Sequence, residues 1–175
     1  MSAMPFRFPS PVYPIADAVD GRDTLALAEA LLAGGARLLQ LRAKTLATGA
    51  FVELARAVKA AADRAGALLI INDRTDIARL IDAGGVHLGQ DDLPPADARA
   101  LLGQDKVIGV STHTLDQVDA ALAAGAIDYL AFGPIFATRS KRDPDPVQGL
   151  DALRATRARC PLPLVAIGGI DATTL

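Results

Sequence analysis

What the sequence has little of excludes several classes of protein. There is one cysteine, Cys160, and no Cys-x-x-Cys pair, so neither an internal disulfide nor a cysteine-based zinc site is expected. Tryptophan is absent and aromatic residues make up 4% of the chain, which leaves few rings on which nucleic-acid bases could stack. The 18 basic and 20 acidic residues give a net charge of -2, without the basic excess typical of a nucleic-acid-binding protein.

Long apolar runs are also missing. The longest, such as residues 67–71, fall far short of the roughly 20 residues that a membrane helix requires. Residues 1–14 lack the apolar stretch and cleavage site of a secretory signal. We therefore expect a cytoplasmic protein with no membrane and no nucleic-acid partner. The sequence leaves the oligomeric state open, a homo-oligomer included.

The chain nevertheless has ample material for a core, because 51% of its 175 residues are hydrophobic. Short apolar runs alternate with longer segments that are rich in Ala and Leu and have helical spacing. The spacing predicts seven strands, at residues 12–16, 37–42, 68–72, 85–88, 107–111, 129–132 and 164–167. It predicts helices between them at residues 24–33, 47–65, 75–83, 94–102, 115–124 and 149–159.

Such βα alternation with short connections predicts one α/β domain built on a parallel sheet. Two architectures dominate in this class, an open doubly wound sheet and a closed (β/α) barrel. The units recur every 20 to 30 residues or so, and no Gly-x-Gly-x-x-Gly motif follows the first strand. We therefore expect the barrel, in which polar groups at the carboxyl ends of the strands form the active site.

Charged residues follow several of the expected strands. Arg42 and Lys44 lie at the end of the second strand and Lys141 follows the sixth, and converging cations suit a multiply charged phosphate ligand. Asp73 and Asp92 follow the third and fourth strands. Magnesium is commonly held by one or two carboxylates together with substrate phosphates, so this pattern predicts a Mg²⁺–diphosphate site.

A second phosphate site is indicated at the end of the seventh strand. Gly168 and Gly169 precede an expected helix start at Asp171. Backbone N–H groups at a helix N-terminus bind phosphate, and the late strands of a barrel are the usual place for such a site.

Some of these residues have simpler structural interpretations. Asp92 precedes two prolines and could cap the next helix, and Asp73 could pair with the adjacent Arg74 or cap a helix. Lys141 could belong to a solvated loop.

The position of a residue in the expected barrel also indicates whether it has a functional role. Gln40 and Arg42 lie on one face of their strand, which is the interior face of a barrel, where an unpaired arginine is unfavourable. Arg42 is therefore the strongest single candidate. His87 is expected to be a hydrogen-bonded interior residue, His113 a loop residue, and Cys160 inert.

These motifs, taken in order, resemble the thiamine-phosphate synthase family from about Val12 to Leu175. The matching segments are Gln-Leu-Arg-Ala-Lys at 40–44, Ile-Asn-Asp-Arg at 71–74, the run at 85–94 that contains His-Leu-Gly-Gln-Asp-Asp-Leu-Pro, and residues 109–114, 133–141 and 166–170.

The resemblance implies a (β/α)8 TIM barrel that joins a hydroxymethylpyrimidine diphosphate to a thiazole phosphate and releases pyrophosphate. It implies that the pyrimidine diphosphate is bound by Gln40, Arg42, Lys44, Asn72, Ser111 and Lys141, with Arg42, Ser111 and Lys141 taking part in catalysis. It further implies that Asp73 and Asp92 bind Mg²⁺, and that the thiazole phosphate is bound by Thr138, Arg139, Ser140 and Gly169 (or Gly168).

The resemblance also implies an eighth strand. The sequence reaches Leu175 shortly after the seventh expected strand, so we expect residues 1–175 to form a single barrel domain without its eighth βα unit.

Two other functions stay open from the sequence. One is the related thiazole tautomerase, with His113 as the first candidate base. The other is a barrel that binds a phosphate ligand without catalysis.

Overall fold

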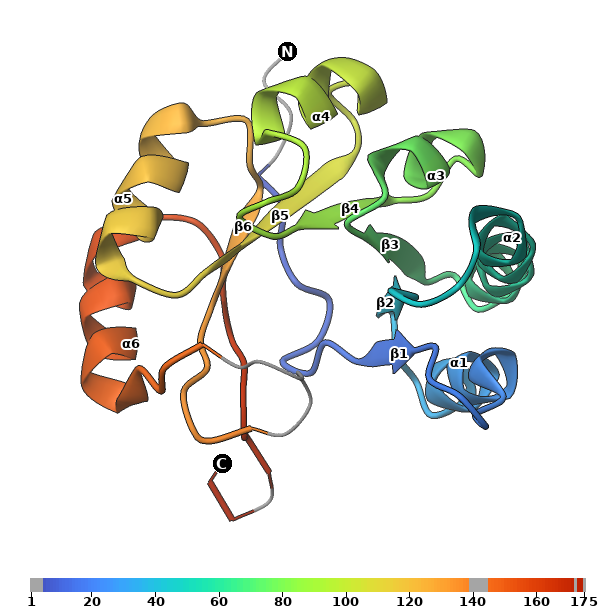
Figure 1. Cartoon of the computed structure of the whole chain (residues 1–175), viewed down its shortest axis with the longest axis horizontal. Helices are drawn as coiled ribbons and strands as arrows, with labels where there is room; N and C mark the ends of the chain where they lie inside the picture. Colours follow the sequence, from blue (N-terminus) through green and yellow to red (C-terminus); the bar gives the residue numbers. More distant parts are fainter. Residues whose placement is uncertain (1–4, 139–144, 172, 175) are drawn as a thin grey trace.

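Seven parallel strands form one curled sheet with six helices outside it, in the part of the chain that the structure describes (Figure 1). The structure is a computed structural model, and it describes residues 5–138, 145–171 and 173–174. The strands are β1 (Ile15–Asp17), β2 (Leu38–Arg42), β3 (Leu68–Asn72), β4 (Gly85–Leu88), β5 (Val107–Thr112), β6 (Tyr129–Phe132) and β7 (Leu164–Ala166). The helices are α1 (Thr24–Ala33), α2 (Thr48–Arg64), α3 (Thr75–Leu80), α4 (Pro95–Leu102), α5 (Leu115–Ala124) and α6 (Gly149–Arg159).

The order of the strands decides between the two expected architectures. Every strand pairs in parallel with its neighbour in sequence, from β1 through to β7. A doubly wound sheet would reverse direction at a switch point, and no reversal occurs here. The barrel topology is therefore confirmed, and within the described residues β1 pairs only with β2 and β7 only with β6.

The first strand is shorter than the apolar run that predicted it. The run begins at residue 12, whereas β1 begins at Ile15. Proline has no N–H to donate to a ladder, and Pro14 contributes only its carbonyl oxygen, which accepts from Gln40 N at 3.0 Å.

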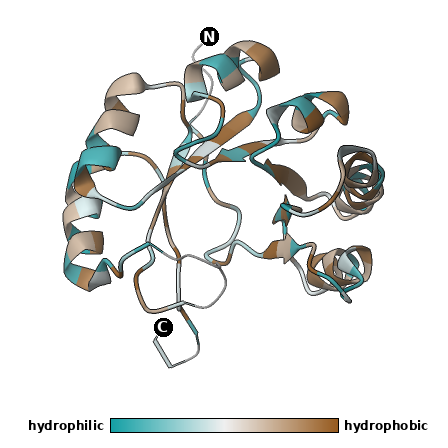
Figure 2. Cartoon of the chain, in the orientation of Figure 1, coloured by the Kyte–Doolittle hydropathy of each residue, from teal (hydrophilic) through white to brown (hydrophobic). Residues whose placement is uncertain are grey.

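The outer face of the sheet packs against the helices. Side chains at alternate positions of the strands, such as Leu39, Leu41, Ile71 and Val86, are fully buried in this layer. Figure 2 shows the hydrophobic colouring concentrated in the strands, whereas the helices mix hydrophobic and hydrophilic stretches. This pattern is typical of helices that cover a sheet on one side and face solvent on the other.

The inner face of the sheet is filled partly by the N-terminal segment. This segment passes between the β5–β6 side and the β1–β2 side of the sheet before it enters β1 (Figure 1). The rings of Phe6, Phe8 and Tyr13 lie with their centroids 5.8, 5.1 and 6.0 Å from that of the buried Tyr129. Gly109 provides the room, because a Cβ there would lie 2.0 Å from Cζ of Tyr129.

No helix in residues 5–138, 145–171 or 173–174 combines the length and the apolar character needed to cross a membrane.

Candidate active site

Polar side chains from four neighbouring strands meet where the strands end. Lys44 Nζ, beyond β2, lies 3.1 Å from Asp73 Oδ2, beyond β3. Asp73 in turn lies against Asp92, beyond β4. Gln90 Nε2, in the same loop as Asp92, donates to the carbonyl oxygen of Ser111 in β5 at 2.6 Å. Charged residues therefore gather at the carboxyl ends of β2, β3 and β4, and Gln90 links this group to Ser111 of β5.

The two carboxyl groups form a close pair. Asp92 Oδ2 accepts a hydrogen bond from Gly89 N at 2.6 Å, which turns the side chain back toward its own strand. Asp73 has a φ of 63°, a left-handed conformation that is uncommon for residues other than glycine. Burial raises the pKa of Asp73, and the hydrogen bond and charge of Asp92 raise it further, while Lys44 acts in the opposite direction.

Both simpler interpretations of these aspartates are wrong. The residue that caps α4 is Pro94, with no side-chain hydrogen bond to the helix, so Asp92 is not an N-cap. Arg74 forms a two-pronged pair with Asp76, at 2.8 and 2.6 Å, so Arg74 is not the partner of Asp73. The N-cap of α3 is Arg74 and not Asp73, so the local alternatives that the sequence offered are removed at both positions.

This donor set fits magnesium bound together with a substrate. Among the described residues no group of three or more His, Cys, Asp or Glu side chains could hold a metal ion. Asp73 and Asp92 supply hard carboxylate oxygens, and Mg²⁺ usually keeps water and phosphate oxygens in its remaining positions. A pair of carboxylates beside a lysine therefore suits an ion that arrives with a diphosphate.

Arg42 is paired with a carboxylate, which the sequence analysis did not identify. Its Nη1 donates to Asp17 Oδ2 at 2.6 Å. Asp17 and Arg42 are register partners on β1 and β2, so the sheet itself brings them together. Arg42 does lie on the same face as Gln40, as predicted, since Ile15 and Asp17 are their respective partners on β1.

A chain of hydrogen bonds crosses the barrel interior to Ser111. Gln40 Nε2 donates to Tyr13 Oη at 3.2 Å, and the Tyr13 and Tyr129 hydroxyls are 3.1 Å apart. Tyr129 Oη lies 2.8 Å from His87 Nδ1, and His87 Nε2 lies 2.8 Å from Ser111 Oγ. His87 is thus the hydrogen-bonded interior residue that the sequence predicted.

Tyr13 and Tyr129 were missed by sequence reasoning. Burial raises the pKa of Tyr13 to about 12 and that of Tyr129 well above 10. Both hydroxyls therefore stay protonated and act as hydrogen-bond donors at neutral pH. The available signal was that the only two tyrosines of the chain lie in expected strands.

The other end of the candidate site is formed by the segments after β6 and β7. Gly168 and Gly169 have positive φ, and a Cβ on Gly169 would lie 2.4 Å from the carbonyl oxygen of Ala137. The segment that contains Thr138 therefore lies directly against Gly169. Predicted site residues Arg139, Ser140 and Lys141 lie outside the described residues, and Asn72 is buried at the end of β3 beside His87.

The expected helix start at Asp171 is not found in the described residues. Asp171 Oδ1 accepts from Thr173 N at 2.8 Å, and Thr174 N donates to the Asp171 carbonyl oxygen at 3.1 Å. These contacts form a turn.

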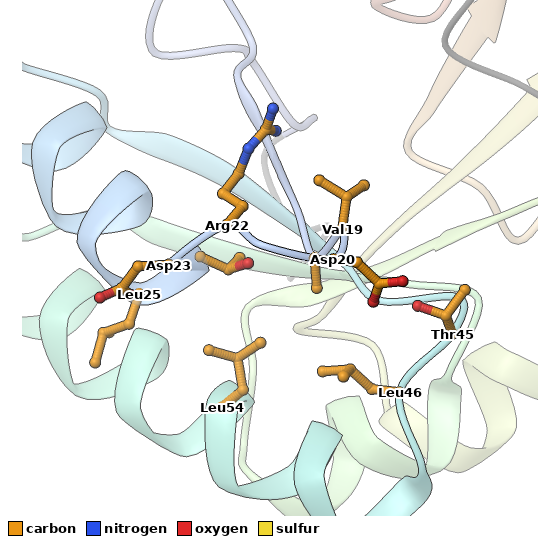
Figure 3. Close-up of a pocket in the computed structure, with 10 residues that line it drawn as sticks. Val19, Asp20, Arg22, Asp23, Leu25, Thr45, Leu46 and Leu54 are labelled. Carbon is orange, nitrogen blue, oxygen red and sulfur yellow. The ribbon is translucent and has the colours of Figure 1, made fainter.

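One hollow opens beside Arg42 and Lys44, and a second adjoins it. One, of about 250 Å³, is lined by Asp17, Ala18, Val19, Asp20, Arg42, Lys44 and Thr45. The other, of about 230 Å³, shares Ala18, Val19, Asp20 and Thr45 with it and continues outward between α1 and α2. Figure 3 shows Leu46 and Leu54 pointing into this outer hollow, while Arg22 points away from them.

A curled parallel (β/α) sheet with cations and paired carboxylates at the carboxyl ends of its strands is typical of barrel enzymes that bind phosphorylated substrates. Comparison with known proteins identifies the family within this class. Residues 12–175 match the family model described as thiamine monophosphate synthase. The chain belongs to the thiamine-phosphate synthase family.

Individual relatives agree with the family match. The thiamine-phosphate synthase of Moorella thermoacetica is 50% identical over 151 residues, which cover 86% of this chain and 71% of that protein. The thiamine-phosphate synthase of Anaeromyxobacter dehalogenans is 50% identical over 152 residues, 87% of this chain and 68% of its own. The structure of a thiamine phosphate pyrophosphorylase from Pyrococcus furiosus superposes with a TM-score of 0.80 at 31% identity, over 91% of this chain and 75% of that one.

Proposed function

We propose that this chain joins 4-amino-5-hydroxymethyl-2-methylpyrimidine diphosphate to 4-methyl-5-(2-hydroxyethyl)thiazole phosphate, giving thiamine phosphate and pyrophosphate. The observation that carries the proposal is the cluster of Lys44, Asp73 and Asp92, in which a cation and two carboxylates from three strands lie together. This cluster combines a diphosphate-binding charge with metal-binding oxygens, and the family membership gives it a substrate.

The proposed chemistry depends on the departure of pyrophosphate. Arg42 and Lys44 would neutralise the charge that develops on the leaving group, and Lys141 would add a third cation from the segment after β6. Asp73 and Asp92 would hold Mg²⁺, which supplies further charge neutralisation when it is bound. The aminopyrimidine ring can support the cation that remains, and the thiazole nitrogen then captures it, so no protein nucleophile is required.

The rest of the site is assigned to binding. We place the pyrimidine against Gln40, Asn72 and Ser111, because the hydrogen-bonded chain through Tyr13, Tyr129 and His87 fixes the orientation of its two end groups. We place the thiazole phosphate between Gly169 and the segment that holds Thr138, Arg139 and Ser140. The contact between Gly169 and Ala137 supports this arrangement.

The tautomerase alternative needs an acid–base residue, and its first candidate was His113. In this structure His113 Nδ1 bonds the Gly133 carbonyl oxygen at 2.6 Å, and His113 Nε2 lies 3.5 Å from Asp145. These contacts hold the ring between β5 and the segment after β6. The synthase is the better supported function, since the relatives carry that name and the Lys44–Asp73–Asp92 cluster has no use in a tautomerase.

The proposal is tested by measuring pyrophosphate release with both substrates, with each substrate alone, and with EDTA. Release is expected only when both substrates and Mg²⁺ are present. Conversion between thiazole phosphate isomers without pyrophosphate release would show the tautomerase instead, and no turnover of any substrate would leave a binding protein.

A pair of lysine variants sharpens this test. Lys44→Ala is expected to lower kcat/KM for the pyrimidine diphosphate on the order of 10²-fold, because Lys44 faces the leaving group. Lys59→Ala is the matched control, since Lys59 pairs with Asp63 one turn further along α2 and is not part of the Lys44–Asp73–Asp92 cluster. Equal effects of the two substitutions would contradict the proposed site.

A further inference from the structure

Asp17 is a charged residue at the site to which neither the sequence nor the family resemblance assigns a role. It ends β1, and its Oδ2 accepts from Arg42 Nη1 at 2.6 Å. Both side chains are mostly buried, with 26% of Asp17 and 22% of Arg42 exposed. Ala18 N also donates to the Arg42 carbonyl oxygen at 2.8 Å, so the backbone holds the two residues in register.

Asp17 is separate from the metal-binding carboxylates. The residues that the structure describes contain no group of three acidic side chains close enough to share an ion, so Asp17 does not join Asp73 and Asp92. Asp17 does line the same hollow of about 250 Å³ as Arg42 and Lys44. The strands that end at Asp17 and Arg42, β1 and β2, pair side by side (Figure 1).

We propose that Asp17 is a positioning residue that holds one amino group of Arg42, so that the remaining N–H groups of the guanidinium face the diphosphate. This inference rests on the proposed role of Arg42 in binding the pyrimidine diphosphate. A guanidinium has five N–H donors in a rigid plane, and the bond to Asp17 uses only Nη1. An arginine restrained in this way loses less conformational freedom when it binds phosphate.

Asp17 has a second, opposing effect, because its negative charge lies near the diphosphate and repels it. The two effects predict opposite results when Asp17 is replaced. If positioning dominates, loss of Asp17 weakens substrate use; if repulsion dominates, loss of Asp17 strengthens it. The short contact and the burial of both side chains favour positioning.

The test is steady-state kinetics of Asp17→Ala and Asp17→Asn in the wild-type and Arg42→Ala backgrounds. Asp17→Ala is expected to lower kcat/KM for the pyrimidine diphosphate about tenfold while the KM for the thiazole phosphate is unchanged. Asp17→Asn should have a smaller effect, since the amide oxygen still accepts a hydrogen bond. In the Arg42→Ala background neither substitution should have any further effect, because the residue through which Asp17 acts is gone.

Two results would overturn the inference. One is a higher kcat/KM in Asp17→Ala and Asp17→Asn, which would show that repulsion between Asp17 and the diphosphate dominates. The other is an equal loss in the Arg42→Ala background, which would show that Asp17 acts independently of Arg42. Urea denaturation of each variant checks that the fold is retained, and Asp119→Ala, which breaks the exposed pair with Arg159 on α5 and α6, is the control expected to be silent.

Binding of Mg²⁺ and inorganic pyrophosphate, measured by calorimetry, separates this inference from the proposed function. Unchanged affinity in Arg42→Ala would remove the proposed role of Arg42, and the inference about Asp17 with it. Weaker affinity in Arg42→Ala but unchanged affinity in Asp17→Ala would overturn the inference about Asp17 alone.

Discussion

Asp73 combines a proposed role in metal binding with features that lower the stability of the folded protein. It sits between Lys44 and Asp92 with a positive φ, and its carboxyl group is mostly buried. Neither the conformation nor the neighbouring carboxylate favours a stable ligand-free protein. Such strain is found where the surrounding structure fixes a residue for function.

Asp73→Asn is expected to raise the melting temperature of the ligand-free protein at neutral pH. The raised pKa of Asp73 means that the folded protein keeps a proton that the unfolded chain has already released, so wild-type stability falls as pH rises from about 4 through the raised pKa. Asparagine does not ionise and also tolerates positive φ. A gain of 1 kcal/mol corresponds to roughly 2–4 °C in a protein of this size.

Thermal melts from pH 4 to 8 in the presence of EDTA would measure this effect. The difference in melting temperature between Asp73→Asn and the wild type should be smallest at pH 4. It should grow with pH until Asp73 is fully ionised. A variant that is less stable than the wild type at pH 7, or a difference that does not grow with pH, would contradict the assigned cause.

The sequence was sufficient to predict which residues lie at the strand ends. It was not sufficient to predict which side chains they would bond to. Arg42 and Asp17 are 25 positions apart, and Tyr13 and Tyr129 are 116 positions apart. Only the strand register and the path of the N-terminal segment bring these pairs together. The sequence likewise left Asp92 undecided between helix cap and ligand, because the bond from Gly89 N depends on the conformation of the loop.

At the scale of elements, helices and strands were predicted about equally well: three of each have the expected bounds, whereas α3 ends at Leu80 instead of the expected residue 83. α1, α5 and α6 have the bounds that the sequence pattern indicated, because ten or more residues of periodic pattern define them. The first strand is shorter than its apolar run, since strand length depends on the neighbour that offers hydrogen bonds.

Arg99 joins three elements at the end of the sheet opposite the candidate site. Its guanidinium donates to Asp128 Oδ2 at 2.7 Å and to the carbonyl oxygens of Gly103, Lys106 and Ala126. Asp128 Oδ2 also accepts from Ile108 N at 2.7 Å, at the start of β5. The end of α4, the start of β5 and the segment before β6 therefore depend on one side chain.

Arg99→Ala is expected to destabilise the protein by about 2–4 kcal/mol, because it leaves a half-buried carboxylate and several carbonyl groups without their donor. The KM for the pyrimidine diphosphate should not change, since the substitution is remote from the carboxyl ends of the strands. Urea denaturation measures the loss, with Arg159→Ala as the control. Arg159 forms an exposed pair with Asp119, and its loss should change stability by less than about 1 kcal/mol. Similar effects of the two substitutions would contradict the account of Arg99.

At the scale of the whole molecule, we propose a single barrel domain whose interior is filled by its own N-terminal segment. The rings of Phe6, Phe8 and Tyr13 cover Tyr129 on the inner face of the sheet. The sequence predicted the barrel but not this packing, because residues 5–11 have no regular periodicity. Closure of the interior depends on contacts between the first residues of the chain and β6.

The two tyrosines provide a direct test of this packing. The pKa of Tyr13 is raised to about 12 and that of Tyr129 well above 10, so the folded protein should show no tyrosinate absorbance at pH 10 to 11. The chain has two tyrosines and no tryptophan, so the ultraviolet signal comes from this pair alone. Tyrosinate formation at pH 10 in a protein that remains folded by circular dichroism would contradict the buried arrangement.

The same shifts predict sensitivity to alkali. Because the folded pKa of Tyr13 lies above the unfolded value near 10, its contribution to stability is complete below pH 10 and is lost as pH rises toward 12. A difference of about two pKa units corresponds to roughly 2–3 kcal/mol. Tyr13→Phe should therefore lose less stability than the wild type between pH 10 and 12, as urea denaturation at each pH would show.

We propose that Asp73 and Asp92 hold the magnesium that accompanies the diphosphate. The most direct test is pyrophosphate release as a function of Mg²⁺ concentration in the wild type, Asp92→Asn and Asp91→Asn. Asp91 is the matched control, because it is adjacent, of the same residue type and exposed to solvent. Asparagine preserves size and hydrogen bonding and caps helices as well as aspartate does, so it removes only the charge that a metal ligand needs. The account predicts that Asp92→Asn raises the Mg²⁺ requirement at least tenfold or so, while Asp91→Asn stays close to the wild type. A wild-type magnesium dependence in Asp92→Asn would contradict it.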